Sequence, residues 1–157
     1  MKKMQVIAVS GSVGSGKTTV AKRLAKQKGY RYINAKQIIE KNKLKEKYDR
    51  KRQTYDVDVK RLNRVLIKLI ESSKKDKKIK GLVIDSHLSH YLPGKYIDLC
   101  IITACSNLKE LEKRLKKRGY SKAKIDENIE CEIMKVCLME AKEAGHKIKV
   151  VETRKKR

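Results

Sequence analysis

The sequence contains no phenylalanine and no tryptophan, and it has a single proline, Pro93. Its basic residues are therefore not interleaved with an aromatic platform on which the bases of a nucleic acid could stack. No apolar run approaches the roughly 18 residues that a membrane-spanning helix needs, so no membrane partner is expected. We find no internal repeat and no linker, and residues 1–157 are expected to form a single domain.

Acidic residues are also scarce, because 18 Asp and Glu stand against 42 Lys and Arg, for a formal net charge of +24. Such an imbalance favours polyanionic partners, namely nucleotides, RNA or an acidic protein. Much of the charge also fits solvated lysines on helix faces, as in residues 74–78. Composition alone therefore leaves contact with RNA open.

Cysteine occurs four times, and no two cysteines form a C-x-x-C pair. The four lie within apolar periodic stretches, which favours buried free thiols over zinc ligands or disulfides. They are Cys100, Cys105, Cys131 and Cys137. We therefore expect a reducing, cytoplasmic environment.

The sequence does contain Gly-Ser-Val-Gly-Ser-Gly-Lys-Thr at residues 11–18, which matches the G-x-x-x-x-G-K-[ST] phosphate-binding loop, or P-loop. The motif directly follows the apolar run 6–9, as a strand-to-helix loop should. Its glycines allow backbone N–H groups to turn onto phosphate oxygens. Lys17 adds a positive charge, and the Thr18 hydroxyl is placed to ligate Mg²⁺. The motif predicts that the chain binds a nucleoside triphosphate.

Short apolar strands alternate with helical patterns along the chain. Strands are expected at residues 6–9, 30–33, 82–85, 97–104 and 148–151. Right-handed β-α-β crossovers between them give a parallel sheet covered by helices. The predicted fold class is α/β: a P-loop NTPase domain with three α/β/α layers and a five-stranded parallel sheet.

The helical patterns fall at residues 18–28, 36–47, 59–70 and 108–119, and from 125 to the closing Gly145. The segment 47–56 is charged and weakly patterned, which indicates a mobile insertion. Residues 154–157, Arg-Lys-Lys-Arg, are expected to form a disordered basic tail.

Asp85 ends the strand at 82–85, where a P-loop enzyme places a carboxylate near the Mg²⁺ shell. A turn-forming aspartate after a strand is the alternative interpretation. His87 and His90 follow, and with Asp85 they suggest a transition-metal site. No further ligand cluster accompanies them, so a hydrogen-bonding role beside Mg²⁺ and phosphate fits better.

Arg114 and Arg118 are four residues apart, so both guanidinium groups share one face of a helix. A planar guanidinium neutralises the oxygens of a phosphoryl group in transfer, which favours a catalytic role, above all for Arg118. A solvated basic face is the alternative. Gly119 favours a hinge that moves Arg118.

The P-loop, Tyr32-Ile33-Asn34, Asp85-Ser86-His87, Arg118-Gly119-Tyr120 and the segment 126–133 together resemble the adenylate kinase isoenzyme 6 family, in order over roughly residues 5–152. This family of kinases and ATPases occurs in archaea and eukaryotes. Its eukaryotic members act in maturation of the small ribosomal subunit. The specific part of the resemblance is Arg118-Gly119-Tyr120 together with the segment 126–133. The P-loop is less specific, because many kinases share it.

The resemblance implies a nucleoside-monophosphate-kinase type of domain, with a short acceptor-binding insertion at about 34–57 and a small lid at about 117–127. It implies transfer of the γ-phosphate of MgATP to AMP, with ATPase activity. The implied ATP-binding residues are Gly14, Gly16, Lys17, Thr18, Thr19 and Arg118. The implied catalytic residues are Lys17, Asp85, His87 and Arg118, and Mg²⁺ would be held by Thr18 directly and by Asp85 through water.

Two features depart from the family pattern. The insertion is often acidic in the family, whereas residues 43–52 are strongly basic here. Relatives also usually continue into a final helix beyond the position of Val151. We expect other surfaces of the chain, or contacts in an oligomer, to replace the packing of that helix.

Two other functions remain open from the sequence. The first is an ATP-switched assembly factor that binds pre-rRNA or a small-subunit ribosomal protein and whose kinase activity is incidental; the net charge and the basic tail support it. The second is a kinase of a small metabolite on the same fold, which accounts less well for the segments around Asp85 and Arg118.

Overall fold

The computed structural model describes residues 3–153, so the expected basic tail at 154–157 lies outside the described part of the chain. Its centre is a five-stranded sheet in the order β2-β5-β1-β6-β7, and all neighbouring strands are parallel. The strands are β1 (Gln5–Gly11), β2 (Arg31–Asn34), β5 (Gly81–Asp85), β6 (Leu99–Ala104) and β7 (Ile148–Glu152). The prediction of a five-stranded parallel sheet is confirmed.

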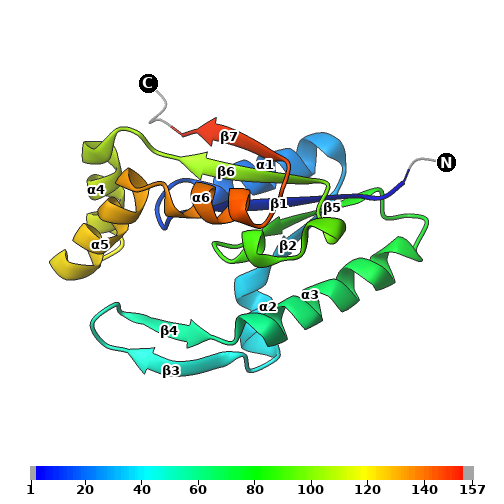
Figure 1. The fold of residues 1–157 in the computed structure, drawn as a ribbon, viewed down its shortest axis with the longest axis horizontal. Coiled ribbons are helices and arrows are strands. Elements are labelled where there is room, and N and C mark those ends of the chain that lie inside the picture. The colour runs from blue at the N-terminus through cyan, green and yellow to red at the C-terminus, as the bar shows by residue number, and fades with distance from the viewer. Residues whose placement is uncertain (1–2, 154–157) are drawn as a thin grey trace.

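Helices cover both faces of this sheet (Figure 1). They are α1 (Lys17–Lys28), α2 (Ala35–Lys41), α3 (Val59–Lys74), α4 (Leu108–Lys117), α5 (Lys122–Ile133) and α6 (Val136–Glu143), with two short 3₁₀ turns, η1 (Ser89–Tyr91) and η2 (Gly94–Tyr96). In β1, Ile7 and Val9 pack against α1, whereas Val6 and Ala8 belong to the core beneath α3 and α6. Because alternate residues of a strand face opposite sides, both faces of β1 are buried, and its residues 6–9 are all apolar.

The segment after β2 differs from the prediction of a helix at 36–47 followed by a mobile insertion. Helix α2 ends at Lys41, and a two-stranded antiparallel hairpin follows, formed by β3 (Lys45–Asp49) and β4 (Thr54–Val57). Both strands are almost entirely exposed, so they lack the apolar alternation that identifies a strand in a sequence.

The helix predicted from residue 125 to Gly145 is also wrong as a single element. It consists of α5 and α6, separated at Lys135, whose backbone is left-handed with φ 52°. The apolar spacing continues across the break, and no glycine or proline marks it. A left-handed lysine carries no signal of its own in the sequence.

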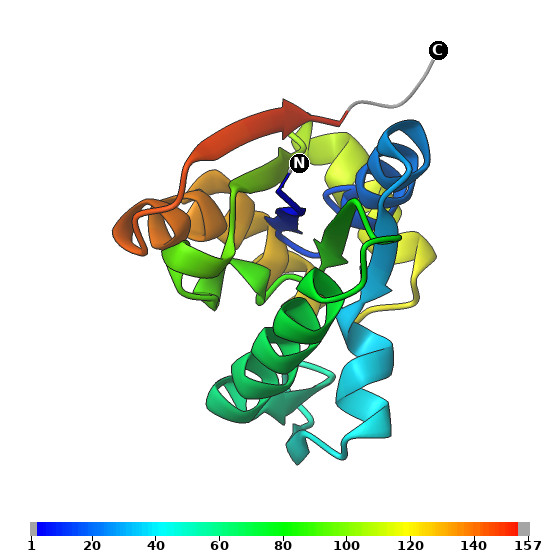
Figure 2. The same ribbon diagram turned by 90° about the vertical axis from the view of Figure 1, so that its right-hand side faces the viewer.

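The carboxyl ends of the sheet strands meet at one edge, where α4 and α5 lie (Figure 1). The hairpin, α2 and α3 extend away from the sheet (Figure 2). Across residues 3–153, none of the helices has the length and apolar character required to cross a bilayer.

Candidate active site

The P-loop connects β1 to α1 at the carboxyl edge of the sheet. Gly11, Gly14 and Gly16 have φ of 144°, 82° and 93°, conformations that L side chains rarely adopt. A Cβ at Gly14 would lie 3.1 Å from Leu115, and one at Gly16 would lie 3.0 Å from Thr153. The loop therefore has backbone conformations that favour glycine, and it also packs closely against α4 and the chain after β7.

Hydrogen bonds hold this loop from several sides. The Ser15 hydroxyl donates to the Ser12 carbonyl at 2.6 Å and pairs with the Thr103 hydroxyl at 2.7 Å. Arg114 donates to the Gly14 carbonyl at 3.1 Å and to both oxygens of Thr153. The guanidinium of Arg114 is thus used to fix the loop, and the structure does not place it as a free phosphate ligand.

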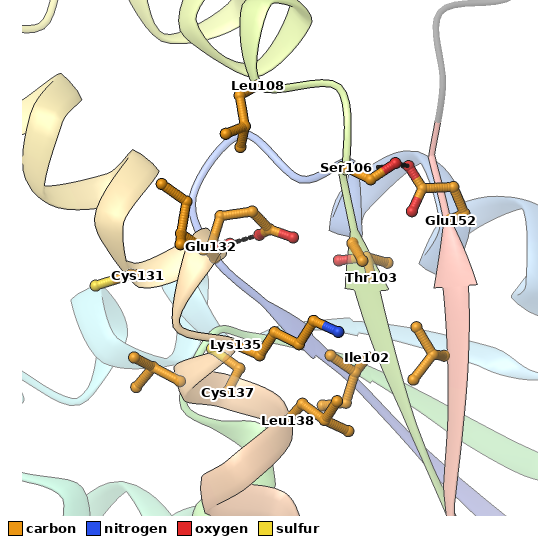
Figure 3. Close-up of a pocket in the computed structure, with 15 residues that line it drawn as sticks. Ile102, Thr103, Ser106, Leu108, Cys131, Glu132, Lys135, Cys137, Leu138 and Glu152 are labelled. Atoms are coloured by element: carbon orange, nitrogen blue, oxygen red, sulfur yellow. Dashed lines mark hydrogen bonds between the residues drawn. The ribbon is translucent and has the colours of Figure 1, made fainter.

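Glu132 is a further contact of the loop that the sequence did not single out. Its carboxylate accepts hydrogen bonds from the Ser12 hydroxyl and, at 3.1 Å, from the backbone N–H of Cys105. It lies on the wall of a pocket of about 360 Å³ between β6 and the α5–α6 junction (Figure 3). The side chain of Lys135 extends across this pocket. Glu132 therefore links α5 to the phosphate loop.

Lys17 lies at the start of α1, and its ammonium donates to the Ser12 carbonyl at 3.0 Å. Partial burial lowers the pKa of Lys17 to about 8, although negative groups such as Asp85 and Glu132 act in the opposite direction. The charge of Arg118 lowers the same pKa, so this exposed arginine lies within electrostatic range of the P-loop lysine.

This lowered pKa predicts a pH dependence of nucleotide binding. In the free protein Lys17 loses its proton as the pH rises through about 8, whereas bound phosphates would favour the protonated form. The apparent Kd for ATP, measured by calorimetry, should therefore rise about tenfold between about pH 7 and pH 9. In a Lys17→Arg control the cation stays charged, so this rise should disappear. An equal rise in that control would contradict the assignment to Lys17.

Asp85 connects two neighbouring elements at the same edge. Its carboxylate, which is only 6% exposed, accepts a hydrogen bond from the Thr18 hydroxyl at 2.8 Å and from the Tyr32 hydroxyl at 2.5 Å. Burial, followed by the contact with Asp85, raises the pKa of Tyr32, which keeps its hydroxyl protonated as a donor. Tyr32 orients the carboxylate, a role that its place in a short strand did not indicate.

The same pair of side chains suits Mg²⁺. A hydroxyl and a carboxylate are the hard oxygen donors that this cation prefers, and they lie in hydrogen-bond contact next to the P-loop lysine. Thr18 and Asp85 are thus brought together, and their role in holding Mg²⁺ stays a prediction. Within residues 3–153, no three His, Cys, Asp or Glu side chains are grouped so that they could hold a metal ion.

The two histidines after Asp85 have different surroundings. The side chain of His87 is exposed, and reduced hydration of its ring, followed by the charge of Lys17, lowers its pKa. His90 is buried, pairs with the Ser10 hydroxyl at 2.7 Å and lies 3.3 Å from Glu140. His90 therefore belongs to the interior beneath the loop, and of the two side chains only that of His87 is exposed.

The predicted lid spans the turn after α4 and the first part of α5. Gly119 has φ 78° with open space around it, which permits the turn that follows Arg118. The tip of the hairpin meets this region through three contacts, here called the clasp. Arg52 pairs with Glu127 at 3.1 Å, the Gln53 side chain accepts from the Ser121 N–H at 2.7 Å, and the Gln53 carbonyl accepts from Lys124 at 3.0 Å.

Comparisons with known proteins agree with this geometry. Residues 7–135 match the model of a family described as an AAA domain. A Pyrococcus furiosus protein named "Putative adenylate kinase" is 38% identical over 149 residues, covering 94% of this chain and 74% of its own length. The adenylate kinase isoenzyme 6 homolog of Caenorhabditis elegans is 33% identical over 138 residues, covering 88% and 72%. The chain belongs to the adenylate kinase isoenzyme 6 family.

Solved structures of other kinases share the fold of this isoenzyme 6 family member. Shikimate kinase from Acinetobacter baumannii, in complex with shikimate, superposes with a TM-score of 0.64 at 14% identity, covering 99% of this chain and 87% of that one. Deoxyadenosine kinase from M. mycoides gives a TM-score of 0.51 at 19% identity, covering 94% and 90%. At these identities the likeness establishes the P-loop kinase fold alone.

Proposed function

We propose that this protein transfers the γ-phosphate of MgATP to AMP. The observation that carries the proposal is the contact of Thr18 with Asp85 beside Lys17, at the head of the P-loop, in a chain of this family. Relatives from archaea carry the name adenylate kinase, which supports a nucleoside monophosphate as acceptor. A broader choice among nucleoside monophosphates is part of the proposal.

Each site residue then has a defined task. Backbone N–H groups of the loop around Gly14 and Gly16, with Lys17 and the first turn of α1 at Thr18 and Thr19, hold the phosphates of ATP. Thr18 and Asp85 would hold Mg²⁺, which neutralises charge on the β- and γ-phosphates. Such transfer depends on positioning and charge neutralisation, so no protein general base is required.

The lid and the insertion complete the site in this proposal. Arg118 lies within electrostatic range of Lys17, and movement about Gly119 would bring it to the phosphates. The charge of Lys17 lowers the pKa of His87, so this ring lies within electrostatic range of the same lysine, and in this proposal it would hydrogen-bond phosphate or water. Residues 34–57, which comprise α2 and the hairpin, face the acceptor side, and closure there excludes water from the reaction.

The proposal is tested by an assay that couples ADP formation to a colour change, with AMP, CMP, GMP and UMP as acceptors and with ATP hydrolysis measured alone. AMP should give the highest kcat/KM. Slow hydrolysis without acceptor would support the ATPase activity that the family resemblance implies. Hydrolysis that equals the rate with every acceptor would contradict phosphoryl transfer.

The second candidate function is the ATP-switched factor in maturation of the small ribosomal subunit, acting in the cytoplasm on a ribosomal protein or pre-rRNA. The net charge of +24 favours it, since a polyanionic partner would neutralise such a surface. The four free thiols are compatible with a reducing compartment. Affinity for pre-rRNA that falls steeply with salt and differs between ATP and ADP would support this role.

The clasp yields a prediction about turnover. Arg52→Glu places two carboxylates opposite each other at Glu127, so the hairpin tip should separate from the lid and the KM for AMP should rise about three- to tenfold. The double variant Arg52→Glu/Glu127→Arg restores the pair with reversed charges and should recover most of this loss. Failure of the double variant to recover while both proteins remain folded would show that the ion pair does not contribute to closure.

A further inference from the structure

The hairpin concentrates positive charge at the end of the molecule that extends from the sheet. Residues 41–52 contain seven Lys and Arg against one Glu and one Asp. Arg52 pairs with acidic groups, and Lys45 lies 3.7 Å from Glu40. Within the described residues the other hairpin cations form no ion pair, namely Lys43, Lys47, Arg50 and Lys51. This surface therefore has uncompensated charge to offer to an anion.

The hairpin also brings together two tyrosines that are separate in the sequence. Tyr48 and Tyr55 are direct cross-strand partners, with ring centroids 4.9 Å apart, and each is nearly half exposed. The ammonium of Lys45 lies 4.8 Å from the centroid of the Tyr55 ring. The expectation of no aromatic platform among the basic residues is thus wrong here, because strand pairing joins positions that linear spacing separates.

The fold supports this surface without covering it. Leu44 is buried at the base of the hairpin, and its carbonyl accepts from the Asp58 N–H at 3.3 Å. From residue 45 to residue 56 every side chain except Asp49 is exposed. Figure 1 shows the hairpin apart from the sheet, running from α2 and α3 toward α5. Two exposed rings and several free cations in this position have little role in stabilising the core.

We propose that the hairpin face formed by Tyr48, Tyr55 and Lys45 binds single-stranded RNA. Bases that are not paired expose the faces that tyrosine rings stack on, while lysines and arginines contact the backbone phosphates. An acidic peptide would use the cations but gain little from the rings, and a duplex would hide its base faces. This inference goes beyond phosphoryl transfer, because RNA binding at the hairpin requires no chemistry at the P-loop.

The test measures binding of a fluorescent single-stranded oligouridylate of about 12 nucleotides by anisotropy, without ATP. The variant Tyr48→Ala/Tyr55→Ala should bind about tenfold or more weakly, because it loses both stacking surfaces. The control Tyr48→Phe/Tyr55→Phe keeps the rings and should bind within about twofold of the wild type. No binding by the wild type, or equal binding by the alanine variant, would overturn the proposal.

Salt dependence separates a local site from diffuse charge. Lys45→Ala/Lys47→Ala should reduce the slope of log K against log salt by about 1.4, for two lost phosphate contacts to a single strand. Lys77→Ala/Lys78→Ala removes the same charge beyond the opposite end of α3 and should leave the slope unchanged. An equal reduction in this control would overturn the hairpin as the site.

Two further outcomes distinguish other ligands for the same face. A duplex of equal length should bind more weakly than the single strand, and its binding should not depend on the tyrosines. Excess AMP should leave the bound oligonucleotide in place. Displacement by AMP would assign the tyrosines to the acceptor nucleotide and overturn the proposal. Because ATP is absent, the outcome is independent of phosphotransferase activity.

Discussion

Lys17→Ala is expected to lower kcat/KM for ADP formation from ATP and AMP by about 10³-fold or more, to the background of the assay. The ammonium is the cation of the P-loop itself, next to the pair formed by Thr18 and Asp85. Partial burial in the free protein lowers the pKa of Lys17 to about 8, and we expect bound phosphates to favour its charged form again.

The fold should survive this substitution, because the ammonium of Lys17 makes a single hydrogen bond, to a backbone carbonyl, within the described residues. The Tm of the Lys17→Ala variant should stay within a few degrees of the wild-type Tm. The matched control is Lys26→Ala, which removes an exposed lysine from the same helix and should retain full activity. Normal ADP production by the Lys17 variant would end the proposed mechanism.

Gly11→Ala should have the largest effect on stability among the loop glycines. At φ 144° the backbone is strained for any L side chain, and the added Cβ would lie 2.3 Å from the Thr103 hydroxyl and 2.7 Å from the Thr103 carbonyl. A carbonyl within a central strand cannot move aside as a flexible side chain can. Strain and overpacking together should lower the free energy of unfolding by about 2–5 kcal/mol, measured in urea.

Gly29→Ala provides the matched control for that measurement. Gly29 also has a positive φ, of 69°, but a Cβ there would meet nothing within 4 Å. Gly29→Ala should lower the free energy of unfolding by only about 1 kcal/mol, because the only cost is that of placing an L side chain on a left-handed backbone. The difference between the two variants reports the close approach of the P-loop to β6 together with the greater backbone strain at φ 144°. Equal effects would show that this approach does not constrain the loop.

The sheet and the P-loop were predictable because local patterns encode them. The strand at 82–85 consists of three apolar residues followed by Asp85 and is buried at every residue. The loop glycines fall at the positions where the backbone is left-handed or strained. The pairing of Thr18 with Asp85 followed from the rule that parallel strands present their carboxyl ends at one edge.

The parts that the sequence did not predict depend on contacts between distant residues. Glu132 reaches Ser12 across 120 positions, and Tyr32 reaches Asp85 across 53, so no spacing rule points to either. The hairpin has few apolar residues to identify its strands, and its position depends on Leu44 at the base and on Gln53 at the tip. Tertiary contacts override the weak local signal in such segments.

The hydrogen bond from the Thr153 hydroxyl to the Ser15 carbonyl joins residues that are 138 positions apart. Closing so long a stretch of chain costs conformational entropy, so this contact depends on the ordered sheet between its two ends. The observed shape of the phosphate loop therefore depends on the segment after β7 being in place. A nucleotide that requires this shape will bind the completed fold and not its precursors. In the proposed function, ATP would then be a ligand that selectively stabilises the fully folded chain.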